Sequence, residues 1–226
     1  MKKMILAVGI MASVMLLFCS VIKAEEPGLK GEKGFVSLLD ETGLNPEVWQ
    51  GNLASYKMVN GVLIASPGGI VFTKAEYSDF VFRFEFKLPP AGNNGIGIRC
   101  ATKGSPGRTG MEIQILDDTA KEYRNLDPTQ YNAAVYGVVA PSPKPVCPVG
   151  QWNTEEIRLV GSKIKITVNG QVVIDTDLAT ITTFPIKGLV PGIHNKSGHI
   201  AIAGHNSPVE FRNIRVLSLT NTTDKE

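Results

Sequence analysis

Four polar side chains occur at strand-like positions from which they could act together on a small molecule: Arg99, Glu112, Gln114 and His205. A carboxylate can accept a proton, an amide or guanidinium can donate to a developing oxyanion, and an imidazole can protonate a leaving group. The residues alone also fit a solvated sheet face on which Arg99 merely neutralises Glu112. In that case Gln114 would only bond a hydroxyl group, and His205 could be a metal ligand.

Side chains alternate between the two faces of a β-strand, so the apolar positions predict which polar groups share a face. In the run around Glu112 the methionine and the isoleucines point inward, and Glu112 and Gln114 therefore point outward. In 95–100 the two isoleucines and Cys100 form the inward set, which leaves Arg99 outward. The alternation thus predicts that these three polar groups line one surface.

The run 198–205 adds an imidazole to the same surface. Its two isoleucines pair with the core, so His199 and His205 share the outer face with two alanines. Small residues on such a face leave room for a ligand to approach the sheet. We interpret His199, like His194, as structural.

The whole chain has the pattern of an all-β protein. Helical periodicity is nearly absent, and short β-branched and aromatic runs are separated by Gly, Pro and Asn clusters. Asn60-Gly61 and Asn169-Gly170 each predict a two-residue hairpin turn. The predicted strands are 35–38, 56–59, 62–66, 70–72, 80–88, 95–100, 111–116, 153–160, 163–168, 171–175, 198–203 and 209–217.

One strand predicts the core and one long segment predicts a loop. In 80–88 the four phenylalanines alternate with polar residues and valine, so we expect all four rings to be buried. The segment 117–150 contains five prolines and cannot form a central strand. Its tyrosines indicate an ordered loop over the rim of the site, from which Tyr136 or a neighbour reaches the substrate.

The N-terminus has the pattern of an export signal. A basic start, an apolar run to Phe18 and a small residue at Ala24 predict a cleaved signal peptide over 1–24, a domain over 25–219 and a frayed tail over 220–226. We therefore expect a periplasmic or secreted protein. The apolar run is shorter than a membrane span, although lipidation of Cys19 is a second way to anchor the chain.

Charge and cysteine content limit the partners. Without the signal peptide, 20 basic residues remain against 21 acidic ones, and no basic block is left that would bind nucleic acid or anionic lipid. Cys100 and Cys147 could form a disulfide in an oxidising compartment, but the sequence does not show that they meet.

Several motifs, in order, carry a resemblance to a known family. They are 78–88 (SDFVFRFEFKL), 92–99 (GNNGIGIR), 110–117 (GMEIQILD), 149–154 (VGQWNT), 168–170 (VNG) and 209–215 (VEFRNIR). Together they resemble the 3-keto-disaccharide hydrolases over 35–219. The resemblance implies a two-sheet antiparallel jelly-roll sandwich of the concanavalin A-like lectin and glucanase type, with a sugar site on the concave sheet. Family members often carry a Gln where this chain has Ala203-Gly204, which puts the substrate's identity in doubt.

The resemblance also implies a reaction that needs only one carboxylate. Ordinary retaining glycosidases use two carboxyl groups about 5 Å apart, whereas this strand offers only Glu112 on the sugar-facing side. A ketone at C3 acidifies the C2 proton, so one base can start an elimination at C1, after which water adds to the product. The expected roles are base for Glu112, donors to the C3 oxygen for Arg99 and Gln114, and acid for His205.

Five residues of the motifs and the loop are expected to bind the saccharide. They are Gln114, Asn94, Glu85, Asp117 and Tyr136. The polar cluster could also hold a divalent cation, although no spacing matches a dedicated metal motif. We expect no other cofactor, because the nucleophile-elbow, phosphate-loop and CxxC patterns are missing from the sequence.

A non-catalytic carbohydrate-binding module is the main alternative, because this fold also serves lectins. Such modules usually expose aromatic rings on which sugars stack, and this chain has only Trp49 and Trp152. A scaffold that binds another protein is a third interpretation, without positive support.

Overall fold

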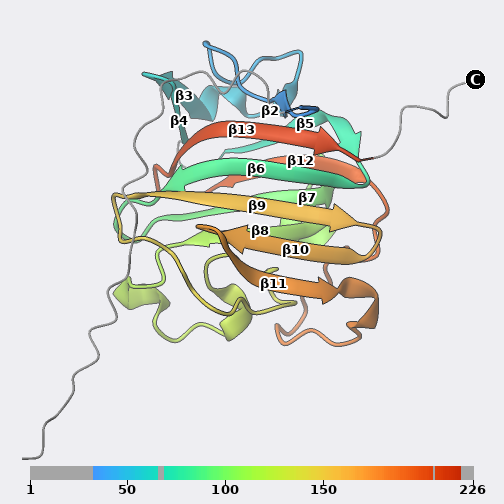
Figure 1. Cartoon of the computed structure of the whole chain (residues 1–226). Helices are drawn as coiled ribbons and strands as arrows, with labels where there is room; N and C mark the ends of the chain where they lie inside the picture. The colour runs from blue at the N-terminus through green and yellow to red at the C-terminus, as the bar shows by residue number, and fades with distance from the viewer. Residues whose placement is uncertain (1–32, 66–68, 206, 220–226) are drawn as a thin grey trace, which may run out of the picture.

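The computed structural model describes residues 33–65, 69–205 and 207–219. Two antiparallel sheets pack face to face, which confirms the predicted all-β sandwich (Figure 1). The predicted signal peptide, Cys19 and the predicted C-terminal tail lie outside the described residues. Within the described part of the chain, no helix is long and apolar enough to cross a membrane.

The larger sheet has eight strands and lies at the front of Figure 1. Its order is β11 (Gln171–Asp177), β10 (Lys163–Val168), β9 (Trp152–Val160), β6 (Phe80–Lys87), β13 (Glu210–Ser218), β4 (Val62–Ala65) and β3 (Tyr56–Val59), while β1 (Val36–Ser37) also pairs with β13.

The smaller sheet has five strands and lies behind the larger one in Figure 1. Its order is β2 (Trp49–Gly51), β5 (Ile70–Tyr77), β12 (Gly198–Gly204), β7 (Asn93–Cys100) and β8 (Met111–Leu116). The short helices are α1 (Pro106–Thr109), η1 (Leu53–Ser55), η2 (Lys121–Tyr123), η3 (Pro128–Gln130) and η4 (Leu178–Thr180). Strand β2 was not predicted, because three residues ending in glycine give too short a pattern.

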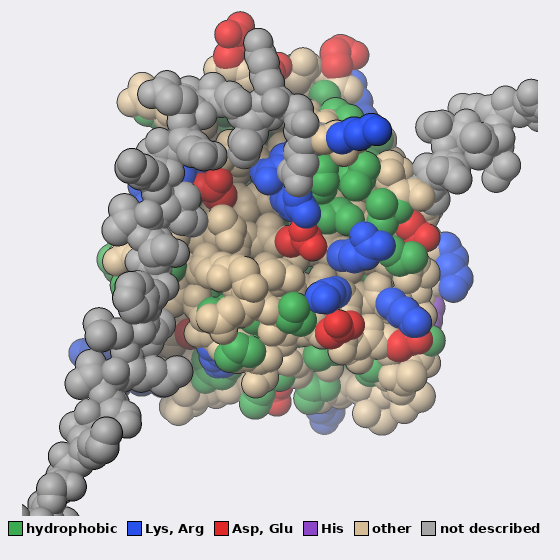
Figure 2. Space-filling model, in the orientation of Figure 1, with side chains coloured by type: hydrophobic (Ala, Val, Ile, Leu, Met, Phe, Trp, Pro, Cys, Tyr) green, Lys and Arg blue, Asp and Glu red, His purple; other side chains and the backbone are tan. Residues whose placement is uncertain are grey.

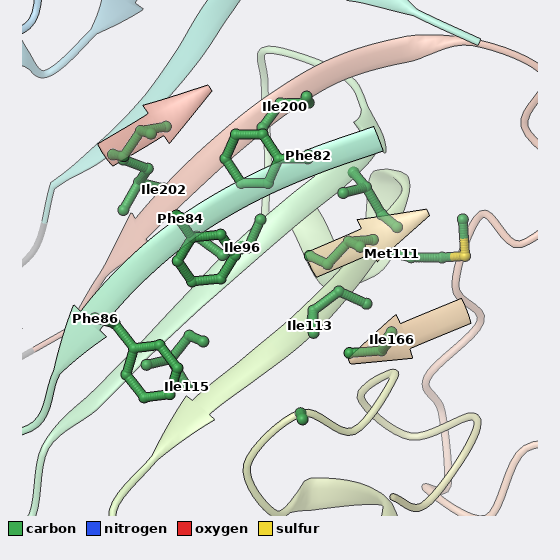
Figure 3. Packing of buried hydrophobic residues seen from close by; sticks show 14 of the residues in the cluster. Phe82, Phe84, Phe86, Ile96, Met111, Ile113, Ile115, Ile166, Ile200 and Ile202 are labelled. Carbon is green, nitrogen blue, oxygen red and sulfur yellow. The ribbon is translucent and has the colours of Figure 1, made fainter. Parts of the chain in front are cut away.

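The core lies between the sheets. The rings of Phe80, Phe82, Phe84 and Phe86 are at most 2% exposed, as predicted. Phe82, Phe84 and Phe86 face the isoleucines of β7, β8 and β12 across the sandwich (Figure 3). Burying a side chain of this size contributes about 1.5–3 kcal/mol, so this strand is a main source of stability.

Both predicted hairpin turns are present. Val59 pairs with Val62 and Val168 pairs with Gln171, so each turn has two residues. The Asn and Gly of both turns have positive φ, between +48° and +78°. Their backbone twist matches that of the flanking strands, which is why Asn-Gly favours this turn.

A β-bulge in β7 changes the faces predicted for its last residues. Cys100 pairs with His199 and Gly97 with Ala201, so Ile98 and Arg99 together oppose a single residue of β12. The bulged Arg99 has φ +45°. The extra residue reverses the alternation, and the prediction that Cys100 points inward is wrong. Its thiol packs on the outer face with Phe72 and Ala201 and is free, so no disulfide joins it to Cys147.

The segment 117–150 is ordered and covers the free edge of β8. Its backbone bonds to β8 on both sides of Gln114, with Gln114 N donating to Ala134 O and Ala133 N donating to Gln114 O. Tyr136 N donates to Glu112 O at 2.8 Å. The loop therefore extends the five-stranded sheet by a short irregular stretch beside Glu112.

The core contains one buried carboxyl group without a partner. Glu155 in β9 lies between Phe84 of β6 and Val168 of β10, and it is 2% exposed. Neither of its carboxyl oxygens has a hydrogen-bond partner in the described structure. Desolvation raises the pKa of Glu155 well above its usual range, so the folded protein keeps this proton to a higher pH than the unfolded chain does.

This difference predicts a pH-dependent stability that Glu155→Gln removes. Above about pH 4.3, where Glu ionises in the unfolded chain, the folded state still holds the proton, so rising pH favours unfolding. Relative to Glu155→Gln, the wild type should lose up to about 1.4 kcal/mol of unfolding free energy per pH unit until the folded-state pKa is reached. Urea unfolding of both proteins at pH 5, 6, 7 and 8 measures this difference. A difference that stays constant over this range would contradict the prediction.

Candidate active site

The carboxylate of Glu112 lies over a glycine of the neighbouring strand. A Cβ atom on Gly95 would come within 2.1 Å of Glu112 Oε1, and a Cβ on Gly107 within 3.0 Å of Oε2. The Glu112 side chain is 11% exposed. Glu112 pairs with Gly97 in the ladder, so it reaches diagonally over Gly95, and only a residue without a side chain permits this position.

His205 reaches the same carboxylate from the far side of β7. Its Nε2 lies 3.8 Å from Glu112 Oε1, and its side chain is 49% exposed. Strand β12 ends at Gly204, so His205 is the first residue after the strand. The imidazole is thus open to solvent on one side and to the carboxylate on the other, which is a geometry suited to proton transfer.

Gln114 lies on the same face of β8, two residues beyond Glu112. Its Nε2 donates to Asn93 Oδ1 at 3.2 Å, so an amide pair extends the polar surface along the strands. We predicted from the sequence that Asn94 lines the site, but the structure places Asn93 there instead. Asn94 pairs with the inward-facing Ile115 and is completely buried, and its Oδ1 accepts from Gly95 N.

Arg99, the predicted guanidinium donor, does not contact Glu112. Its guanidinium is 2% exposed and donates to the carbonyl oxygens of Ser78, Gly161 and Asn195 and to the carboxylate of Asp79. The bulge turns the side chain toward the end of the sandwich, where it joins three loops. The prediction that Arg99 shares the pocket with Glu112 is therefore wrong.

Glu85, which we also predicted to bind the saccharide, lies on β6 in the other sheet and not beside Glu112. Its carboxylate accepts from Arg212 at 2.7 Å and from Asn213 Nδ2. The outer face of the eight-stranded sheet, which faces the viewer in Figure 2, carries interspersed acidic and basic side chains. Glu85 forms part of this charged ladder, across the sandwich from Glu112.

Asp117 and Tyr136 lie at the boundary of the candidate site. The Asp117 carboxylate accepts from Ala91 N at 2.9 Å and from the hydroxyl of Thr119, so it holds two turns in place. Tyr136 is half-buried, and its hydroxyl lies 2.7 Å from Gln130 Nε2. Its backbone bond to Glu112 O places Tyr136 next to Glu112, as a wall residue supplied by the loop.

The turn α1 covers one side of Glu112 and was not anticipated. Pro106 packs over Gly97, where an added Cβ would lie 2.6 Å from the proline ring, and Gly107 lies beside the carboxylate, where an added Cβ would come within 3.0 Å of Oε2. Arg108 on this turn is exposed and donates from Nη1 to Gly188 O. The Ser-Pro-Gly sequence at 105–107 was the available signal, because proline favours the first turn of a helix.

Burial makes the nearby thiol an unsuitable nucleophile. Desolvation raises the pKa of Cys100 to about 12, and the charge of Glu112 adds to the shift. The thiol therefore stays protonated at neutral pH. Among the described residues, no group of three or more His, Cys, Asp or Glu is arranged to hold a metal ion.

The two packed antiparallel sheets, with a carboxylate, an imidazole and an amide on the outer face of one of them, place the chain in the class of antiparallel β-sandwich proteins. Within this class, the chain belongs to the 3-keto-alpha-glucoside-1,2-lyase-like domain family, which matches residues 34–217. The family assignment made from the sequence motifs is thereby confirmed.

Individual relatives agree with this assignment. The chain is 24% identical over 178 residues to a 3-keto-disaccharide hydrolase from Bacteroides thetaiotaomicron, and the match covers 66% of this chain and 61% of that protein's length. A crystal structure of a proposed glycosyl hydrolase from Parabacteroides distasonis is 27% identical and has a TM-score of 0.74, over 83% of this chain and all of the other. The carbohydrate-binding module CBM66 from Bacillus subtilis shares the fold at 12% identity, with a TM-score of 0.52 over 81% of this chain and all of the module.

The position of Glu112 predicts that Gly95→Ala disturbs the site and not the fold. The new methyl group would meet a flexible carboxylate end, which can move away, so we expect the free energy of unfolding to change by less than about 1 kcal/mol. The NMR signals of the His205 ring should shift, because the carboxylate leaves its position.

Gly97→Ala provides the contrast for this experiment. An added Cβ there would meet Pro106, Ala201 and Cys100 within 3.1 Å, and these atoms cannot move freely. We expect destabilisation of about 1–3 kcal/mol by overpacking. Equal effects of the two substitutions on urea unfolding would contradict the described position of Glu112.

Proposed function

We propose that this protein cleaves the glycosidic bond of 3-keto disaccharides or related 3-keto glycosides outside the cytoplasm. The observation that carries the proposal is a single carboxylate, Glu112, held over Gly95 within 3.8 Å of a half-exposed imidazole. The other two predicted carboxylates, Glu85 and Asp117, have partners elsewhere. One base with one acid suits an elimination better than a double displacement, which requires two carboxyl groups.

The proposed reaction begins with proton removal at C2. The C3 ketone makes this proton acidic, and Glu112 accepts it while an enolate forms. The enolate expels the substituent at C1, the C1–O bond breaks, and the departing oxygen takes a proton from His205. Water then adds across the resulting C1–C2 double bond, with hydroxide at C1 and a proton at C2, which gives net hydrolysis.

Stabilisation of the enolate falls to the groups that remain in the site. Arg99 cannot supply it, because its guanidinium is bound to three carbonyls at the end of the sandwich. Gln114 uses one N–H of its amide on Asn93, and an amide nitrogen carries two. Its second N–H is our candidate donor to the C3 oxygen.

The positions of both tryptophans count against a purely binding role. Trp49 is buried in the core, at 1% exposure. Trp152 lies on the eight-stranded sheet, with the cations of Lys87 and Arg212 over its ring at 5.0 and 4.1 Å from the centroid. Neither indole is beside Glu112, whereas sugar-binding modules usually present aromatic rings to the sugar.

Glu112→Gln tests the proposal directly. The amide keeps the shape but cannot accept the C2 proton, so turnover of 3-keto-trehalose or 3-keto-sucrose should fall about 100-fold or more. Glu76→Gln is a matched control, because Glu76 also lies near an imidazole, 3.7 Å from His199, away from the candidate site. This control should keep wild-type turnover.

Two further readouts separate the mechanisms. In D₂O, the wild type should incorporate deuterium at C2 of the released 3-keto sugar, and the unoxidised parent sugars should not be cleaved. Equal cleavage of oxidised and unoxidised sugars would exclude elimination, and near-normal turnover by Glu112→Gln would exclude Glu112 as the base.

A further inference from the structure

The β12–β7 ladder ends next to the proposed acid. Ala203 pairs with Gly95 and Gly204 pairs with Asn94, so the next pair in register would join His205 to Asn93. Strand β12 stops at Gly204 instead. The backbone N–H and C=O of Asn93 would therefore lose a strand partner at the place where the site begins.

The side chain of Ser207 forms hydrogen bonds with both of these backbone groups. Its Oγ accepts from Asn93 N at 2.7 Å and donates to Asn93 O at 2.9 Å. A hydroxyl can donate one hydrogen bond, and the Ser207 hydroxyl uses this proton and one of its lone pairs on the backbone of Asn93. Ser207 is 8% exposed, so water cannot readily replace these bonds.

These two hydrogen bonds of Ser207 connect two parts of the candidate site. On one side, Ser207 is two residues from His205, whose Nε2 lies 3.8 Å from Glu112. On the other side, Asn93 accepts from Gln114 Nε2 through its own side chain. Ser207 is thus bonded to the residue that accepts from Gln114, and it stands two residues from the imidazole, beside the strand over which the carboxylate lies.

We propose that Ser207 is a positioning residue, which holds His205 and the Asn93–Gln114 pair in place around Glu112. Its catalytic consequence rests on the function proposed above, whereas its effect on the geometry of the site does not. Shifts of about 1 Å in such groups can cost about 100-fold in rate, so the anchor would affect turnover without touching the substrate.

The first test needs no substrate. Ser207→Ala removes both bonds, and Ser207→Thr keeps the hydroxyl. Thr73→Val is the matched control, because the Thr73 hydroxyl also donates to one backbone group, Ala75 O, and accepts from another, Ile200 N, in the same sheet. We expect the NMR signals of the His205 ring and the Gln114 side-chain amide to move in Ser207→Ala and to stay in place in Thr73→Val. Ser207→Thr should restore the wild-type signals.

The second test is a double-mutant cycle on turnover of 3-keto-trehalose. Ser207→Ala should lower kcat/KM about 10- to 100-fold in the wild type, mainly through kcat. In a His205→Asn background the same change should cost at least about 3-fold less than in the wild type, because one of the two positioned groups is gone. Thr73→Val should not show this dependence on His205.

Unchanged NMR signals in Ser207→Ala would overturn the proposal, and so would equal losses in the two backgrounds. The proposal would also be overturned if Ser207→Ala and Thr73→Val lost activity in the same proportion to their loss of thermal stability. Failure of the wild type to cleave any 3-keto glycoside would refute the proposed function alone, and the NMR comparison would then decide the positioning role by itself.

Discussion

The guanidinium of Arg99 donates hydrogen bonds to carbonyl oxygens from three separate loops, and one of these loops is bonded to the turn that covers the candidate site. One of these carbonyls belongs to Asn195, whose side chain in turn donates to Thr109 O in α1. The same turn carries Gly107, at which an added Cβ would come within 3.0 Å of Glu112 Oε2. A series of hydrogen bonds therefore connects the end of the sandwich to the turn that lies beside the proposed base. A lysine would not replace this arginine, because only a planar guanidinium can address several carbonyls at fixed angles.

The candidate site depends on glycines, which leave space above the sheet, as much as on its polar groups. Glu112 on β8 and His205 just after β12 lie on opposite sides of β7, and their side chains approach to 3.8 Å because Gly95 leaves the space between them open. Gly97 similarly leaves room for Pro106 and the turn that it starts. Small residues on the outer face of this sheet thus bring the carboxylate, the imidazole and the covering turn to one place.

Strand alternation predicted the core and most of the sheet from sequence, because a buried face leaves a period of two in the residue types. The four phenylalanines of β6 and the outward positions of Glu112 and Gln114 follow this rule. It failed at Arg99, since a bulge inserts one residue and reverses the faces without a signal in composition. The choice of Asn94 over Asn93 was a misapplication of the same rule, because alternation back from the inward Ile96 already places Asn94 inward and Asn93 outward, as the register with β8 shows.

Sheet membership was the other information that the sequence lacked. Glu85 has the outward position that alternation predicts, but it lies in the sheet opposite to Glu112. The pairing of distant strands decides this, and no local pattern encodes it. The positions of His205 and Ser207 likewise depend on where β12 leaves the ladder. The strand ends at Gly204, directly after a regular pair with Asn94, and the sequence does not mark this point.

The pairing of residues 133–136 with β8 has a consequence for the protein in a crowded solution. β8 is the last strand of its sheet, and an uncovered edge strand can recruit a strand from another molecule. The loop occupies the backbone groups of β8 at Glu112 and Gln114, so this edge offers no template for self-association there. The strand that bears the proposed base can thus lie at the margin of the sheet, accessible to a small solute through its side chains while its main chain is closed to aggregation.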